Sequence, residues 1–247
     1  MNTLLAAGLV ATIIIGAALI RACLRSWHSP VARRMAVLTT AVVWWSVADL
    51  VEVVSVEPAT KLLAARAAWL GIVAVPIMWW ALMTSYAGAR HLSSPVGVGL
   101  AGIVALPTLA LVASGDPQHA LWASMTAAAT TGSVATEFGP WFVVHSIWAY
   151  ALVLCGLAVG VNRLRGDRRV HRQQAMILIA VVAVPLVANA IAITASNGPM
   201  SADPTPIALA FSVAGLAVSI RRLRLLDLTV GILPVARNAV IDAHSAC

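Results

Sequence analysis

Three ionisable residues stand inside apolar stretches of the N-terminal third of the chain: Asp49, Glu52 and Arg66. Asp49 and Glu52 share one helix face with Trp45, and Arg66 shares a face of the next helix with Trp69. In an antiparallel pair of helices, Glu52 and Arg66 lie at nearly the same depth and could form an ion pair. Charged groups in a bilayer are costly unless they are paired or face a wet cavity. The spacing therefore predicts either a structural ion pair or a polar, tryptophan-lined pocket near one surface of a membrane bundle.

Two further polar residues, His145 and Asn189, also lie in apolar segments. His145 shares a helix face with Trp141 and Trp148, and aromatic walls with a few convergent polar groups are typical of small-ligand sites. Structural alternatives are an interhelical hydrogen bond for His145, an interfacial anchor for Trp141, and a partner for backbone freed by Pro185 for Asn189. The predicted ligand-binding residues are Trp45, Asp49, Glu52, Arg66, Trp69, His145, Trp148 and Asn189.

Several other chemistries find no support in the sequence. It has no CxxC, no HExxH, no glycine-rich phosphate loop and no clear Ser, His and Asp arrangement. The three cysteines lack metal-binding spacing, and His119, Glu137 and His145 are too irregularly spaced to indicate a metal site. A retinal-type receptor needs a lysine within its last helix, whereas the only lysine, Lys61, falls in a predicted loop. We therefore expect no catalysis, no metal and no cofactor.

The composition indicates how these residues must be positioned. Of the 247 residues, 61% are hydrophobic and only 10% are charged, which excludes an ordinary soluble domain. The length suits seven spans of about 20 residues each. We expect these spans at 3–24, 36–56, 62–87, 96–113, 140–161, 174–195 and 207–220, with a long loop at 114–139. The predicted fold is an all-α integral membrane protein, a seven-transmembrane-helix bundle.

The basic residues predict the orientation of this bundle. Of the 16 lysines and arginines, all except Lys61 and Arg66 fall on one side of the predicted spans. The positive-inside rule places that side in the cytoplasm, so the N-terminus is outside and the C-terminus is cytoplasmic. We expect a multi-pass protein of the bacterial inner (plasma) membrane. The excess of basic over acidic residues then indicates the membrane orientation and contact with anionic lipid. Nothing in the sequence indicates binding to nucleic acid.

The segment after the last predicted span has the features of an output element. Its arginines hold the end of the span at the inner headgroups, a proline interrupts the helix, and an apolar stripe then favours packing on a partner, a second copy or lipid. The predicted output residues are Arg221, Arg222, Arg224, Pro234 and Val235. We therefore divide the chain into a seven-helix transmembrane domain, 1–224, and a cytoplasmic juxtamembrane helix, 225–247.

A series of short motifs follows the spans in order. They are Trp45 with Glu52, RxxWLGI from Arg66, PxxWW from Pro76, Tyr86, PxHxLW from Pro117, GPWFxxH from Gly139, Tyr150, Pro185 with Asn189, DPTP from Asp203, and RLRLLDL with LPVARNAV from Arg222 to Val240. In this order they resemble the N-terminal seven-transmembrane sensor region of bacterial histidine kinases. The resemblance covers essentially the whole chain.

The resemblance implies a non-catalytic membrane sensor. A small ligand, a lipid or a change of membrane state would act on the outer pocket, and the last helix would carry the response inward, with a homodimer as the expected form. In the family, PVAR continues into an output module, whereas this chain stops at Cys247. The expected alternatives are a truncated chain or a free-standing receptor that a separate cytoplasmic kinase or other output protein reads. A small-solute transporter or channel is the alternative, and a membrane enzyme a third. Transport would require carboxylates at both membrane depths, but those here lie toward the outside.

Overall fold

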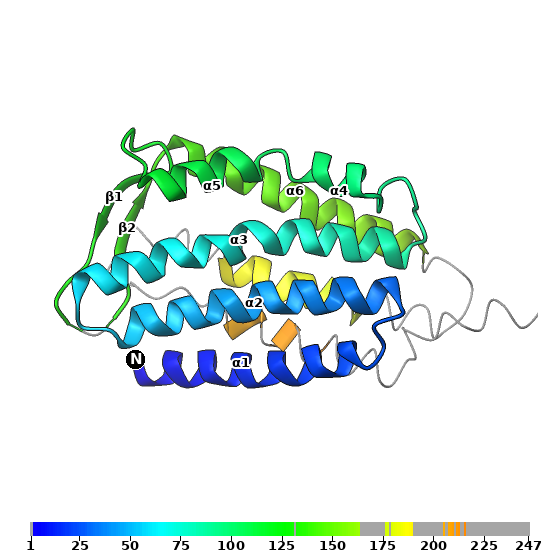
Figure 1. Cartoon of the computed structure of the whole chain (residues 1–247), viewed down its shortest axis with the longest axis horizontal. Helices are drawn as coiled ribbons and strands as arrows, with labels where there is room; N and C mark the ends of the chain where they lie inside the picture. Colours follow the sequence, from blue (N-terminus) through cyan, green and yellow to red (C-terminus); the bar gives the residue numbers. More distant parts are fainter. Residues whose placement is uncertain are drawn as a thin grey trace, which may run out of the picture.

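The computed structural model describes residues 2–130, 132–163, 176–177, 179–189, 205, 207–209, 211–212 and 215. Four long helices run along the length of the molecule (Figure 1). They are α1 (Asn2–Leu24), α2 (Pro30–Val54), α3 (Pro58–Tyr86) and α6 (Pro140–Arg163). All four are long and apolar enough to cross a membrane. The chain is therefore a multi-pass membrane protein.

Further apolar helices lie between and after these four. The pair α4 (Pro95–Ala101) and α5 (Ala105–Ser114) makes a fifth candidate span, and a shorter apolar helix covers Ile179–Asn189. The predicted spans at 174–195 and 207–220 fall only partly within the described residues. The count of seven spans therefore stays a prediction.

Prolines mark where three of the long helices begin. Pro30, Pro58 and Pro140 stand at the first helical positions of α2, α3 and α6, where a missing N–H has no cost. The Ser29 hydroxyl also caps α2 by accepting the N–H of Ala32 at 3.4 Å. As a result α2 begins six residues before the predicted boundary at residue 36. Hydropathy had placed that boundary after the basic residues, which instead lie in the first turns of the helix.

The predicted span at 96–113 is not one helix. It breaks between α4 and α5, whose axes differ by 57°. Gly102 ends α4, and Pro107, in the first turn of α5, has no N–H to donate to the carbonyl of Ile103. Glycine and proline close together are a common cause of sharp bends. The sequence shows both residues, but the prediction passed over them because the whole stretch is apolar.

A β-hairpin replaces the predicted long loop, so the fold is mostly helical and not all-α. Strands β1 (Trp122–Thr126) and β2 (Ala135–Phe138) pair antiparallel, with Trp122 opposite Phe138 and Thr126 opposite Ala135. The hairpin lies at the same end of the bundle as the N-terminus (Figure 1). We call this end the hairpin end. Five- and four-residue strands without clear alternation carry too weak a signal to be predicted from sequence.

Helix α2 lies between α1 and α3 at the centre of the packing (Figure 1). Small residues let the helices approach closely, as is common in membrane bundles. A side chain at Gly71 of α3 would place its Cβ only 2.7 Å from the carbonyl oxygen of Ala41 on α2. The main core contains Leu19 and Cys23 of α1, Met35 and Val42 of α2, and Leu82 and Met83 of α3.

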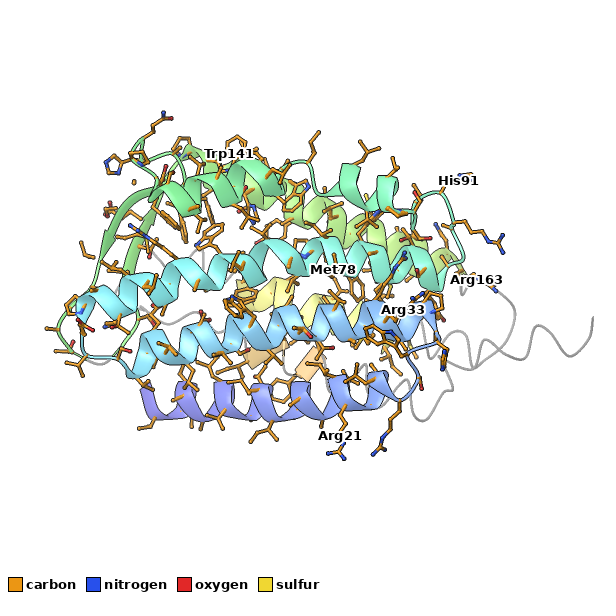
Figure 2. The ribbon with its side chains drawn as sticks, in the orientation of Figure 1. Arg21, Arg33, Met78, His91, Trp141 and Arg163 are labelled. Atoms are coloured by element: carbon orange, nitrogen blue, oxygen red, sulfur yellow. The ribbon has the colours of Figure 1, made fainter. Side chains whose placement is uncertain are left out.

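Basic residues gather at the end opposite the hairpin. Arg21, Arg33, His91 and Arg163 all lie there (Figure 2). At the same end, the Arg34 guanidinium donates to the Ala81 carbonyl at 2.7 Å and also bonds the Ser85 hydroxyl and the Ser93 carbonyl. It thereby ties α2 to α3 and to the segment that follows α3. The predicted output residues, Arg221, Arg222, Arg224, Pro234 and Val235, lie outside the described residues.

Candidate functional site

A cavity of about 180 Å³ lies within the bundle. Its wall is formed by Met35, Leu38, Val42 and Trp45 of α2, Ile72, Val75, Pro76 and Trp79 of α3, Phe142, His145, Ser146, Ala149, Tyr150 and Val153 of α6, Val181, Val182, Pro185, Leu186 and Asn189 of the short helix, and Thr205, Leu209 and Ser212. Of the α2 lining residues, Trp45 is nearest to the hairpin end. It lies nine residues before the end of that helix, or about 13 Å along its axis. The cavity is thus deeper and more apolar than the predicted pocket.

Helices α3 and α6 close one side of the cavity through Trp79. Its indole Nε1 donates to the carbonyl of Val153 at 3.0 Å. A Cβ on Gly156 would lie 2.8 Å from that nitrogen, so glycine at this position allows the indole to approach α6. A buried tryptophan N–H that finds a backbone acceptor costs little, and the ring then supplies apolar wall.

Three polar side chains on the wall are linked to one another by hydrogen bonds. The Tyr150 hydroxyl donates to Asn189 Oδ1, and Asn189 Nδ2 donates to Thr205 Oγ1 at 3.2 Å. These bonds join α6, the short helix and the segment at residue 205. Asn189 does not satisfy the backbone opened by Pro185. Ser212 does, since its hydroxyl donates at 2.6 Å to the Val181 carbonyl, which Pro185 leaves without its helical donor.

His145 is another polar group on the wall, and its side chain is 3% exposed. Its Nδ1 lies 3.4 Å from Thr108 Oγ1 on α5. The same hydroxyl donates to the Val104 carbonyl at 2.8 Å and accepts the indole N–H of Trp141 at 3.0 Å. The predicted interhelical hydrogen bond of His145 is therefore present. Trp141, expected to be an interfacial anchor, takes part in the same bonding.

Aromatic rings connect the cavity wall to the hairpin. The Trp69 ring lies edge-on to those of His145, Phe142 and Trp122, with centroids 5.3, 6.4 and 5.8 Å away. Trp122 is the first residue of β1, whereas His145 and Phe142 line the cavity. The side chain of Trp69 thus touches both the hairpin and the wall.

Trp148 has a structural role beside this cluster. Its ring centroid lies 5.2 Å from that of His145, and its Nε1 donates to the Ala101 carbonyl at 2.8 Å. In a continuous helix that carbonyl would accept the N–H of Ala105, which bonds Gly102 instead. The indole therefore satisfies backbone that the break between α4 and α5 leaves open.

The loop of the hairpin is docked onto the ends of α2 and α3. Lys61, whose side chain is 1% exposed, donates from Nζ to the carbonyls of Thr130 at 2.8 Å and Ala128 at 3.3 Å. Glu52 Oε1 accepts the Val134 N–H at 2.7 Å. The Gly132 N–H donates to the α2 backbone at 3.0 Å. Lys61 was missing from the predicted set, although a single lysine beside the apolar spans could have signalled it.

The base of the hairpin is held by Asp116. Its carboxylate accepts the backbone N–H groups of Ala120, Leu121 and Trp122 at 3.0, 2.6 and 2.8 Å. Burial by itself raises the pKa of this carboxyl, but these three bonds and the nearby His119 lower it, and the net pKa lies below the ordinary value of 3.8. The hydrogen bonds favour the charged form because each N–H points at the carboxylate.

Arg66 and Glu52 have different neighbours. A Cβ on Gly115 would lie 3.4 Å from Arg66 Nη1, which places the guanidinium beside α5, whereas Glu52 bonds the hairpin loop. The predicted ion pair between them is absent from the described residues. The hairpin and α5 supply contacts to Glu52 and Arg66 instead. Arg66 Nε is buried without a hydrogen-bond partner in that same part of the chain.

Residues 4–229 match the family described as the N-terminal 7TM region of histidine kinase. The chain belongs to this family. Among individually curated proteins no match was found. A sensor region of this kind is the non-catalytic input part of a histidine kinase. The resemblance inferred from the order of the motifs is thereby confirmed.

The predicted site residues of this sensor region separate into three groups. The cavity wall contains Trp45, His145 and Asn189, and the aromatic cluster beside it contains Trp69 and Trp148. The remaining three, Asp49, Glu52 and Arg66, lie closer to the hairpin end, with Glu52 in contact with the hairpin loop and Arg66 beside α5. Binding of a ligand by any of the eight stays a prediction.

Proposed function

We infer that this chain is the non-catalytic sensing module of histidine-kinase-type signalling in a bacterial inner membrane. The observation that carries the proposal is the cavity, which three long helices, the short helix and Thr205, Leu209 and Ser212 surround together. An occupant of such a cavity touches every one of these elements at once. It therefore favours one arrangement of the bundle over another, which is what a receptor requires.

The proposed orientation is N-terminus outside and C-terminus cytoplasmic. In support, Arg21, Arg33 and Arg163 lie at the end opposite the hairpin (Figure 2), and basic residues favour the cytoplasmic side. The hairpin would then face the outside. Of two reporter enzymes fused after Cys247, only the one that works in the cytoplasm is expected to be active. Activity of the periplasmic reporter would contradict the cytoplasmic C-terminus.

The proposed signal runs from the hairpin and the cavity toward the last predicted span. The hairpin reaches the wall through Trp69, and the wall includes Thr205 and Ser212, which precede the predicted output residues. A shift of the segment carrying Ser212 would move the exit of the bundle by rotation or translation, the usual motions of packed helices. A dimer of this chain would pass that movement to a cytoplasmic kinase or other output protein.

The transporter alternative is less well supported by the cavity. A path for a polar solute needs polar groups along the depth of the membrane. In the described wall these are only Ser146, Ser212, His145 and the chain of Tyr150, Asn189 and Thr205, and the wall has no carboxylate. An apolar wall with a few fixed polar groups suits binding of a small molecule better than passage of one.

A chimera tests the proposal. Residues 1–247 would be fused to the dimerisation and catalytic domains of a well-characterised sensor kinase that lacks its own membrane region. A series of linkers, each one residue longer than the last, would sample a full helical turn, because the register of the connecting helix affects its output. Phosphorylation of the cognate regulator in cells would be the measurement.

Two matched variants test whether the cavity controls kinase output. Ala149→Leu adds volume on the cavity wall, whereas Ala151→Leu makes the same change on an exposed position of the same helix. We expect Ala149→Leu to change kinase output in those chimeras whose linker length gives a responsive kinase, and Ala151→Leu to leave the output unchanged. If kinase output is the same for both variants in every linker phase, and both reach the membrane in equal amounts, the cavity has no sensing role.

A further inference from the structure

The wall of the cavity combines a large apolar surface with His145, whose hydrogen bonding can be assigned. The Thr108 hydroxyl gives its hydrogen to the Val104 carbonyl and accepts the Trp141 N–H. It can therefore only accept in its contact with His145 Nδ1, so that nitrogen carries the proton. An imidazole with its proton on Nδ1 has a lone pair on Nε2. Among the described residues no donor is bonded to Nε2.

The size of the cavity limits what can fill it. An apolar cavity of about 150 Å³ stays dry and accepts benzene, and the cavity here is about 180 Å³. A single aromatic ring with one or two small substituents, or an aliphatic molecule of similar size, matches that volume. Of the three polar groups that the other elements supply, Asn189, Thr205 and Ser212 each already make hydrogen bonds.

The absence of ionised side chains from the described wall limits the charge of the occupant. No lysine, arginine, aspartate or glutamate lines the cavity within the part of the chain that the structure describes. A charged ligand would lose its hydration without gaining a counter-ion, which strongly disfavours its binding. An uncharged ligand with one polar group would bury its apolar part against the wall and still satisfy that group.

We propose that the cavity binds a small, uncharged, mostly apolar molecule of phenol-like size and chemistry, whose single hydroxyl donates to Nε2 of His145. The proposal rests on the sensor function and specifies the class of its signal. The apolar part lies against Val42, Ile72 and Ala149, and the hydroxyl meets the acceptor on α6. Such molecules partition into a membrane and reach a site within the bundle without a polar channel.

Three probes test the proposal on the full chain purified in detergent. They are 4-methylphenol, 4-fluorotoluene, which has nearly the same shape but cannot donate a hydrogen bond, and 4-methylbenzoate, which is charged. Saturable binding would be measured by equilibrium dialysis, with the uptake of empty micelles subtracted. We expect the first two probes to bind saturably. We expect no saturable binding of the benzoate at concentrations that saturate 4-methylphenol.

Two variants locate the site and its acceptor. Ala149→Leu is expected to abolish saturable binding of both uncharged probes, and Ala151→Leu to preserve it. His145→Leu is expected to lower the affinity ratio of 4-methylphenol to 4-fluorotoluene by about three- to tenfold, the usual range for one hydrogen bond. Retained binding of 4-fluorotoluene shows that this variant is folded. An unchanged ratio would overturn the assigned acceptor, and unchanged binding in Ala149→Leu would overturn the site.

A fallback keeps the proposal testable if His145→Leu does not fold. In the unmodified protein, the affinity of 4-methylphenol is divided by that of 4-fluorotoluene, and this ratio is then divided by the ratio of the two probes' partition coefficients into the same micelles. We expect the corrected ratio to exceed one, and a value of one would refute the hydrogen bond. The kinase chimera separates this proposal from the sensor function. Probe binding without any change of kinase output would refute the sensor function alone. A changed output in Ala149→Leu without saturable binding of any probe would refute the ligand class alone.

Discussion

Replacing Lys61 by methionine should release the hairpin loop from the bundle without unfolding the helices. Methionine keeps nearly the same length and apolar character, but it removes the two hydrogen bonds from Nζ to the carbonyls of Ala128 and Thr130. Those carbonyls belong to exposed loop residues, so water can replace the lost donor once the loop moves away. The helical core does not depend on either bond.

The size of the effect follows from two opposing terms. A hydrogen bond from a charged donor contributes about 1.5–3 kcal/mol, so the two bonds together supply at most about 3–6 kcal/mol. Burial of the ammonium group opposes docking by several kcal/mol. We take a net contribution of about 2 kcal/mol, which corresponds to a roughly thirtyfold change in the opening equilibrium of the loop.

Amide hydrogen exchange measures this opening directly. The N–H groups of Gly132 and Val134 bond the end of α2 and not the partner strand, so their exchange reports docking. In Lys61→Met both should exchange about thirtyfold faster, while amides within α2 keep their rates. The control is Leu63→Met on the same helix, where the side chain is exposed. Unchanged exchange of both loop amides in a folded Lys61→Met protein would refute the anchoring role.

Three further predictions concern other contacts. The pKa of Asp116 lies below 3.8 in the fold. The carboxylate therefore contributes its full stabilisation above the unfolded-state pKa, and this contribution is lost as pH falls through the folded-state pKa. The Tm of Asp116→Asn should be lower than that of the unmodified protein at pH 7, and the difference should shrink below about pH 4. Glu52→Gln and Arg66→Gln should each lower Tm, and their ΔΔG values should add within about 0.5 kcal/mol because the two side chains do not pair. If the double mutant loses much less stability than that sum, the two side chains do form an ion pair. Ser212→Ala should cost about 1–3 kcal/mol, and much less in a Pro185→Ala background where the helix N–H returns; equal costs in both backgrounds would show that the serine does not compensate for the proline.

The sequence predicted which residues would be buried and polar better than it predicted their partners. His145 and Asn189 do line a cavity together with Trp45, because a polar residue in an apolar span must face the interior of a bundle. The predicted partner of Glu52 was wrong, since depth alone placed Arg66 opposite it. The structure provides the Val134 amide of the hairpin loop instead, a contact between residues 82 positions apart that no local pattern encodes.

Membrane class, the first three and the fifth of the predicted spans, and the family follow from the sequence itself, because hydropathy, arginine placement and motif order are properties of the linear chain. The tertiary structure alone decided the break between α4 and α5, the hairpin anchored by Lys61 and the depth of the cavity. Each of these depends on which free backbone groups and side chains meet in space. Ser212 shows the reason most clearly: its hydroxyl donates to the Val181 carbonyl, which is open because Pro185, on another helix, has no N–H to give it.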